Sequence, residues 1–202
     1  MRLPLLALAL CSVPVSIGIF SADTNVGKAQ GSVSYDPRER TYLIAGSGQN
    51  MWDTRDDFHF VWKRMSGNFV LHTRARFIGA GVEEHRKIGW TIRPSLVPGS
   101  AHVTAALHGN GLMSLQFRRA TGAITEEEKS ADSLPDADAV IQLERRDGEY
   151  YMSVARFGDT LVAQRLTDVT LSDTVYVGLF VCSHNDKVTE RAEFRDVRIT
   201  TR

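Results

Sequence analysis

The sequence has little cysteine. Its 202 residues include two, Cys11 and Cys182. Cys11 lies in an N-terminal apolar segment that we expect to be removed, which would leave Cys182 alone. An intrachain disulfide is then excluded, and the mature fold has to be held by its hydrophobic core. We expect Cys182 to be a buried, unreactive thiol, because it lies in a segment that is apolar on both faces.

An excess of charge of either sign is also missing. Lys and Arg together number 24, as do Asp and Glu, so the formal net charge is zero. Nucleic-acid-binding domains usually carry a basic excess, and the sequence therefore predicts no nucleic-acid partner. Metal-ligand spacings such as HExxH are absent, so we expect no metal and no cofactor. A calcium site at Asp53, Asp56 and Asp57 is the alternative, although their spacing does not follow a calcium-binding loop.

One long apolar run is present, and it lies at the N-terminus. Arg2 is followed by a nearly uninterrupted apolar stretch that ends at Phe20, and small residues follow. This order predicts a secretory signal peptide at 1–22, cleaved near Ala22, and hence a periplasmic or extracellular protein. The alternatives are lipidation at Cys11 or an uncleaved membrane anchor, because about 18 apolar residues can just span a bilayer. With the signal removed, no membrane span is expected.

The remaining residues, 23–202, are predicted to form a single domain, since a chain of this length supports one good core. Linkers, repeats and sustained helical periodicity are missing. Short β-prone segments alternate instead with turn residues, which is typical of an all-β sandwich or barrel. We expect strands at 41–46, 58–64, 68–77, 86–93, 102–108, 112–118, 139–146, 149–157, 160–165, 174–183 and 192–200.

Two turns predict the register of their hairpins. Asp147-Gly148 is a typical two-residue hairpin turn, because both positions tolerate positive φ. It pairs the flanking strands so that their apolar residues share one face: Ile141 and Leu143 with Val154 and Met152. A three-residue loop, Gly109 to Gly111, pairs His108 with Leu112 and also keeps the apolar residues of its two strands on one face.

Several segments together resemble a known family. They read GKAQGSVSYDP, GSGQNMWDTRDDFHFVWKRMSGNFVLHTRARF, HRKIGWTIRPSL, HGNGLMSLQFRRATG and AEFRDVRI. These segments are similar to those of the laminin-G-like, concanavalin A-like domain of unknown function found in secreted bacterial proteins. That domain often lies beside carbohydrate-active enzymes or TolB-like propellers. The resemblance covers nearly all of the predicted mature chain. It implies an antiparallel two-sheet jelly-roll sandwich whose concave sheet carries the ligand site, but it transfers no proven activity.

A polar sheet face supplies most of the candidate ligand-binding residues. If the strand at 86–93 alternates, Ile88, Trp90 and Ile92 enter the core and the polar residues point the other way. Amides, imidazoles and guanidinium groups on such a face suit the hydroxyl and acid groups of sugars. Trp52, in a turn, could stack on a sugar ring, and His184 lies at a strand end. The candidates are Lys87, Arg93, His108, Gln116, Arg118, Trp52 and His184. A solvated outer face without function is the alternative.

The sequence therefore favours an exported, non-catalytic carbohydrate-binding module, with an anionic ligand indicated by the basic residues. No catalytic residue is assigned, because the acidic run at 126–128 alternates sides on a strand and no GxSxG motif occurs. A hydrolase or lyase that uses His108 with Arg93, Gln116 and Arg118 is one alternative. A protein-interaction component of a cell envelope is another. The sequence does not define the oligomeric state.

Overall fold

The fold is described from a computed structural model that covers residues 17–134 and 138–202. Residues 1–16, which hold most of the predicted signal peptide and Cys11, lie outside the described residues. Within the described part of the chain, no helix is long and apolar enough to cross a membrane.

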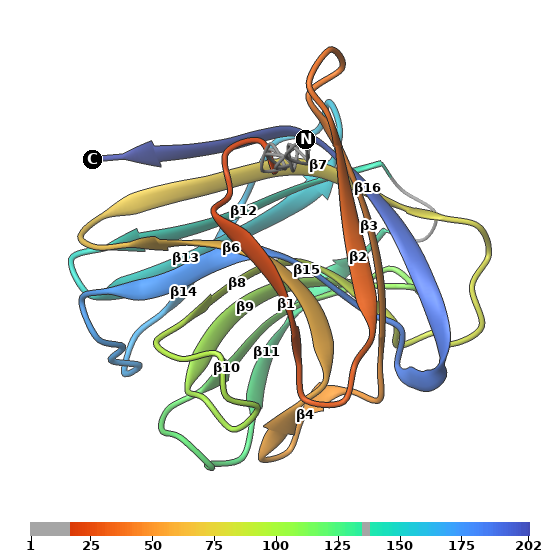
Figure 1. The fold of residues 1–202 in the computed structure, drawn as a ribbon. Coiled ribbons are helices and arrows are strands. Elements are labelled where there is room, and N and C mark those ends of the chain that lie inside the picture. The colour runs from red at the N-terminus through yellow and green to blue at the C-terminus, as the bar shows by residue number, and fades with distance from the viewer. Residues whose placement is uncertain (1–16, 135–137) are drawn as a thin grey trace, which may run out of the picture.

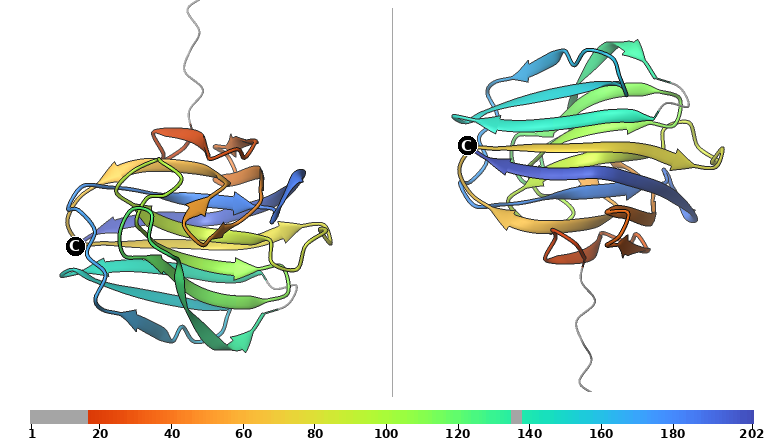
Figure 2. Two further views of the ribbon diagram at one scale, coloured as in Figure 1. Left: turned by 90° about the horizontal axis from the view of Figure 1, so that it is seen from below. Right: turned by 90° about the horizontal axis from the view of Figure 1, so that it is seen from above.

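Two seven-stranded antiparallel sheets pack face to face as a sandwich (Figure 1), which confirms the predicted all-β, two-sheet fold class. In the first sheet the strands lie in the order β1 (Ala22–Val26), β6 (Phe58–Met65), β15 (Val175–Cys182), β8 (Lys87–Arg93), β9 (His102–His108), β10 (Leu112–Arg118) and β11 (Glu126–Ser133). In the second sheet the order is β14 (Ala163–Leu166), β13 (Glu149–Arg156), β12 (Ala139–Arg146), β7 (Phe69–Ile78), β16 (Asn185–Thr201), β3 (Thr41–Gly48) and β2 (Gly31–Asp36). Figure 2 shows the two layers from below and above, with β8 to β10 toward the viewer in one view and β7 and β16 in the other.

Both predicted hairpin registers are confirmed. Ile141 pairs with Val154 and Leu143 with Met152, as the Asp147-Gly148 turn requires. Leu107 pairs with Met113, which is the register that the three-residue loop produces. In each case one apolar face and one turn specify the same alignment, and a slip by one residue would turn every apolar side chain to the wrong side.

The strand predictions missed β1, β2, β11 and the two-residue strands at 51–52 and 55–56, and shortened β16. The strands β1, β2 and β11 lie at the edges of their sheets, where one side is unpaired and alternation is weak. β11 begins with the acidic run at 126–128, which predicted no strand because its residues are polar on both faces. β16 starts at Asn185 and is irregular between Asn185 and Glu190, so its first residues lack a clear period of two.

The main core lies between the sheets and is built from the alternate residues of each strand. Ile88, Trp90 and Ile92 enter it from β8, as predicted, and each is fully buried. Aromatic and aliphatic side chains of β3, β7, β12 and β16 fill the facing side, among them Tyr42 and Phe194. Because no disulfide links the described residues, this apolar burial, worth roughly 25 cal/mol per Å², is the main source of stability.

The opposite face of the first sheet carries a second, smaller core. It contains Met51, Phe58, Phe60, Phe180 and Cys182, all fully buried. A short hairpin of β4 (Met51–Trp52) and β5 (Arg55–Asp56) covers this face, at the bottom of the sandwich in Figure 1. The cover explains why β15 is apolar on both faces. Burial raises the pKa of the Cys182 thiol to about 11, so this thiol is protonated at neutral pH.

Residues just before β1 pack on the sandwich. The Phe20 ring lies 5.3 Å from the ring of Tyr42 and 6.1 Å from that of Trp90, measured between centroids, and Phe20 is 7 % exposed. The Ser21 amide donates to the Trp62 carbonyl at 2.9 Å. Cleavage near Ala22, which stays a prediction, would remove Phe20 from this core. The contacts show that residues 17–21 contribute to the fold when they are present.

Candidate functional site

The register of three neighbouring strands brings the central residues of the site together. Lys87 is the first residue of β8, and it pairs with Cys182 on β15 and with His108 on β9. All three side chains point away from the main core, because their strand neighbours Ile88, Val181 and Leu107 point into it. A cation, a thiol and an imidazole therefore lie side by side on the outer face of the first sheet.

A pocket of about 290 Å³ opens beside Lys87 and His108, and we call it the Lys87 pocket. Five of the seven predicted ligand-binding residues line it: Trp52, Lys87, His108, Gln116 and His184. The other lining residues are Asn50, His85, Leu112, Glu127 and Lys129. The polar sheet face thus borders a pocket at this end, and the β4–β5 hairpin covers it further along.

Lys87 is the most unusual group in the pocket, because its charge is buried without a matching carboxylate. The residue is 3 % exposed, and its Nζ donates a hydrogen bond to Asn50 Oδ1. Among the described residues, no carboxylate lies within ion-pair distance of this nitrogen; Glu127 and Asp56 act on it from further away. Burial lowers the pKa of Lys87 below its ordinary value, because a charged amine is poorly solvated there.

His108 has a defined tautomer. Its Nδ1 lies 3.0 Å from the Leu112 carbonyl oxygen, which can only accept, so Nδ1 carries the proton. The bare Nε2 then accepts from the Gln116 amide at 3.4 Å. Burial, with the nearby Lys87 charge, lowers the pKa of His108 to about 3. The imidazole is therefore neutral at physiological pH, and it serves as a fixed hydrogen-bonding group in the pocket wall.

Gln116 joins this wall from β10. Its Nε2 also donates to Ser114 Oγ at 3.1 Å, whereas its buried Oε1 has no partner among the described residues. An unpaired buried amide oxygen is costly, and it provides an acceptor that a ligand hydroxyl can satisfy.

Arg93 and Arg118 do not line the pocket, although they share the face of Lys87 and Gln116. Both are fully buried beneath the β4–β5 hairpin and bind Asp56. Arg118 holds this carboxylate with two hydrogen bonds, at 2.8 and 2.9 Å, and Arg93 adds a third at 3.2 Å. Neither guanidinium group is exposed to a ligand, so we propose no ligand-binding role for these two residues. Asp56 is also one of the three aspartates of the alternative calcium site, and its carboxylate is bound by the two arginines.

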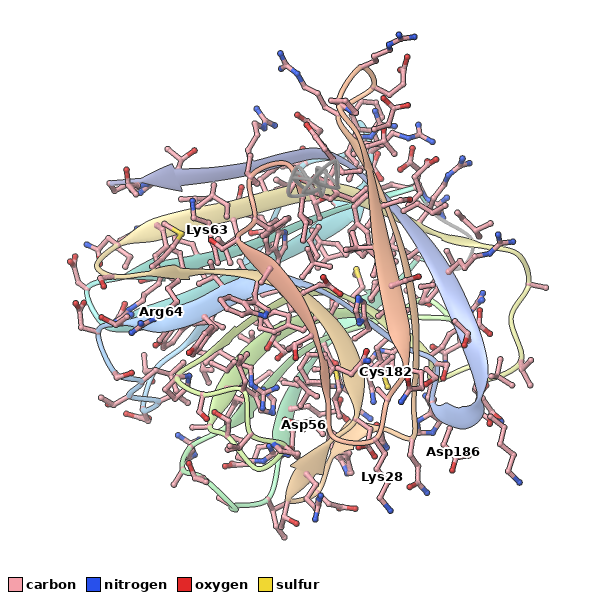
Figure 3. The ribbon with its side chains drawn as sticks, in the orientation of Figure 1. Lys28, Asp56, Lys63, Arg64, Cys182 and Asp186 are labelled. Carbon is pink, nitrogen blue, oxygen red and sulfur yellow. The ribbon has the colours of Figure 1, made fainter. Side chains whose placement is uncertain are left out.

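The buried arginines act as positioning residues for the hairpin. Arg118 Nη2 donates to the carbonyl oxygens of Trp52 and Asp53, at 3.4 and 3.2 Å. Arg93 donates to the carbonyls of Ser95 and Val97, which ties the loop after β8 to the same network. Trp52 is half-buried and stands at the edge of the Lys87 pocket because its backbone is fixed in this way. Figure 3 shows Asp56 in the lower part of the sandwich, away from Lys63 and Arg64.

The rim of the pocket is formed by His85 and His184, whose ring centroids lie 5.7 Å apart. The loop that carries His85 is held by a buried ion pair between Arg86 and Glu190, with 2.7 Å between Nη1 and Oε2. His184 has a φ of 59°, a left-handed conformation that is uncommon for residues other than glycine. Its buried Nδ1 lacks a partner among the described residues. Such local strain is often found at binding sites.

We expect acid to destabilise the fold through His102 and His108. Burial is the main cause that lowers the pKa of each imidazole to about 3, whereas an unfolded histidine titrates near 6.5. Between these values the unfolded chain binds more protons, so each histidine lowers the free energy of unfolding by about 1.4 kcal/mol per pH unit as the pH falls. Urea unfolding at pH 7, 5 and 4 measures this slope.

The His102→Asn variant should flatten that slope by about 1.4 kcal/mol per pH unit. The exposed Gln49 has no titratable group, so Gln49→Asn provides the control and should leave the slope unchanged. An unaltered slope in His102→Asn would show that this imidazole does not remain neutral in the native protein.

Sequence reasoning did not assign Asn50, Glu127 or Lys129 to the site. Asn50 lies in the short link between β3 and β4, two residues before Trp52, where polar residues are ordinary. Glu127 and Lys129 form an ion pair at 3.1 Å on the edge strand β11, and in the sequence they belong to a charge run that is typical of a solvated face. Asn50 could have been assigned to the site because it lies two residues before Trp52, which was already a candidate.

Comparison with known proteins concerns the fold alone. No family model and no curated protein sequence match the chain. A functionally unknown protein from Saccharomyces cerevisiae has a TM-score of 0.66 and 15 % identity, over 86 % of this chain and 97 % of that one. A carbohydrate binding module from Bacillus subtilis has a TM-score of 0.58 and 14 % identity, over 91 % and 98 %. A family 7 alginate lyase has a TM-score of 0.58 and 9 % identity, over 84 % and 81 %. These likenesses confirm the predicted concanavalin A-like jelly-roll fold.

Proposed function

We propose that this protein is a non-catalytic binding module for a carbohydrate with an anionic group, and that the Lys87 pocket is its binding site. The observation that carries the proposal is the buried ammonium of Lys87, which faces the pocket without a carboxylate partner among the described residues. A buried charge is costly unless it is paired. A ligand carboxylate, as in a uronic acid, or a sulfate would supply the missing charge.

The other pocket walls suit a sugar. Asn50, Gln116 and His108 place planar hydrogen-bonding groups around the cation, and the unpaired Gln116 Oε1 accepts from a hydroxyl. Trp52 offers an apolar ring surface beside them. The volume of about 290 Å³ lies just below the range for small-molecule sites, about 300–1,000 Å³, which fits one sugar unit.

The geometry supports binding rather than turnover. A general acid or base works best with a pKa near the operating pH, and the pKa of His108 is lowered to about 3. Arg93 and Arg118, which the enzymatic alternative requires at the substrate, are fully buried against Asp56. The fold likeness to an alginate lyase and to a carbohydrate binding module supports a carbohydrate ligand without choosing between the two activities.

The same proposal places the mature protein outside the cytoplasm, in the periplasm or the extracellular space. Its support is the apolar segment that follows Arg2, which has the order of a secretory signal. Extracellular and envelope polysaccharides that contain uronic acids are then the accessible ligands.

A glycan-array screen of residues 17–202 tests the proposal. We expect binding to glycans that contain uronic acid or sulfate, and weaker binding to neutral glucans. Trp52→Ala should reduce this binding by about tenfold, because an aromatic contact in a binding site is worth about 1–2 kcal/mol. Phe157→Ala removes an aromatic side chain that is 56 % exposed and does not line the pocket, so it should bind as the wild type does.

Three outcomes would contradict the proposal. Absence of binding to any glycan would favour the protein-interaction alternative. Equal binding of neutral and acidic glycans would remove the role of Lys87 as an anion partner. Cleavage of a bound oligosaccharide, detected by chromatography and lost in His108→Ala, would make the protein an enzyme.

A further inference from the structure

A second pocket, of about 670 Å³, adjoins the Lys87 pocket. We call it the hairpin pocket, because most of its walls come from the β4–β5 hairpin and the residues next to it. It is lined by Lys28, Gln49, Asn50, Trp52, Asp53, Thr54, Arg55, Asp57 and His184. Asn50, Trp52 and His184 line both pockets, so the two share a wall and a ligand can extend from one into the other.

The two pockets differ in charge. The hairpin pocket has two cations, Lys28 and Arg55, and two carboxylates, Asp53 and Asp57. The Lys87 pocket has Glu127 in an ion pair with Lys129, which leaves the buried Lys87 as its uncompensated charge. An anionic group is therefore attracted to the Lys87 pocket and gains little in the hairpin pocket.

The hairpin pocket also has free hydrogen-bonding groups. Gln49 and Arg55 are exposed, and within the described residues neither side chain has a hydrogen bond or an ion pair. In the shared wall, the buried Nδ1 of His184 is likewise without a partner in the described part of the chain. Groups of this kind can bind the hydroxyl or amide groups of a neutral sugar.

The hairpin is firmly held, so the two pockets keep a fixed relation. Asp56 in β5 is bound by Arg93 and Arg118 at full burial, and the Asp57 amide donates to the Asn50 carbonyl at 2.7 Å. A ligand that spans both pockets then meets a preformed surface and does not have to order the hairpin.

We infer that the site binds at least two consecutive sugar units: an acidic unit in the Lys87 pocket and a neutral unit in the hairpin pocket, with the glycan chain passing Trp52. This inference rests on the proposed function and narrows its ligand class. Glycans in which acidic and neutral units alternate fit the two pockets better than homopolymers of uronic acid.

Isothermal titration calorimetry of residues 17–202 tests the inference with four probes. They are glucuronate, a hyaluronan tetrasaccharide with alternating glucuronate and N-acetylglucosamine, tetragalacturonate and cellotetraose. We expect the hyaluronan tetrasaccharide to bind at least about tenfold more tightly than glucuronate, because it also occupies the second pocket. A tenfold lower Kd corresponds to a gain of roughly 1.4 kcal/mol in binding free energy. Tetragalacturonate should bind more weakly than the hyaluronan tetrasaccharide, and cellotetraose more weakly still.

Variants separate the two pockets. The double variant Gln49→Ala/Arg55→Ala changes the hairpin pocket and not the Lys87 pocket. It should lower the affinity for the tetrasaccharide to near that for glucuronate, which should bind unchanged. Arg64→Ala is the matched control, because Arg64 is exposed and lines neither pocket (Figure 3), and it should have no effect.

The outcomes are distinguishable. If glucuronate and the tetrasaccharide bind equally well, and the double variant changes neither, the two-unit inference is overturned while the proposed function stands. If the tetragalacturonate binds most tightly, the assignment of a neutral unit to the hairpin pocket is overturned. If none of the four probes binds, the proposed function itself fails.

Discussion

Replacing Asp56 by asparagine is expected to lower the free energy of unfolding by about 3–5 kcal/mol, which is the usual loss when one partner of a buried ion pair is removed. The substituted amide would leave the guanidinium groups of Arg93 and Arg118 in an environment from which solvent is excluded, with no anion to balance them. Some of the hydrogen bonds would persist through the amide oxygen, but the charge compensation would be lost.

Urea unfolding of Asp56→Asn measures this loss, and Asp173→Asn is the matched control. Asp173 is 73 % exposed and lies 3.8 Å from Arg145, so its removal should cost less than about 1 kcal/mol, as for other surface pairs. If Asp56→Asn does not fold, thermal unfolding of Arg93→Met provides the measurement. This change breaks the weaker of the two pairs and leaves Arg118 bound to Asp56. A loss below about 1 kcal/mol in Asp56→Asn would show that the network does not hold the hairpin.

Lys87→Met is expected to change binding and stability in opposite directions. The affinity for an acidic glycan should fall by about 30-fold or more, since losing one partner of a buried charge pair costs about 2–5 kcal/mol. The free energy of unfolding should rise by about 1 kcal/mol or more, because an apolar side chain of similar length replaces a buried charge that has no carboxylate partner among the described residues. Asn50 Oδ1 still accepts from the Met51 amide at 2.8 Å, so it is not left unpaired.

Calorimetry and urea unfolding on the same samples measure the two effects, with Lys187→Met as the control. Lys187 is exposed and lines neither pocket, so both effects should be small. Because burial lowers the pKa of Lys87, anion binding should also weaken as the pH rises through that lowered value, below the range in which an exposed lysine titrates. A stability loss in Lys87→Met would indicate that the native protein already neutralises this charge.

The part of the site that lies on regular strands could be predicted from the sequence, and the hairpin could not. Alternation in β8, β9 and β10 placed Lys87, His108 and Gln116 on one face, and the Gly109–Gly111 loop gave the correct register of β9 and β10. The same pattern placed Arg93 and Arg118 on that face without indicating that they are covered. Their burial depends on Asp56, which is 62 residues from Arg118 in the sequence and lies in a segment of no regular period.

Contacts between residues far apart in the sequence also decide which polar residues are buried, and the local sequence pattern does not show these contacts. Asp56 is one of three closely spaced aspartates, and nothing in their spacing distinguishes the one that is buried from its exposed neighbour Asp53. Edge strands such as β11 present a similar difficulty, because pairing on one side alone imposes a weak pattern. The central strands other than β16, by contrast, are constrained on both sides and were placed almost to the residue.

The β4–β5 hairpin has a consequence for how such a protein can diversify. One aspartate and two arginines anchor it beneath the surface, while its exposed side chains at 53–55 line the hairpin pocket. Exchanges of these exposed side chains would leave the sandwich and the buried anchor untouched. A lineage that conserves the anchor could therefore acquire new ligand preferences by replacing a handful of residues, in the way that one antibody framework carries many different loops.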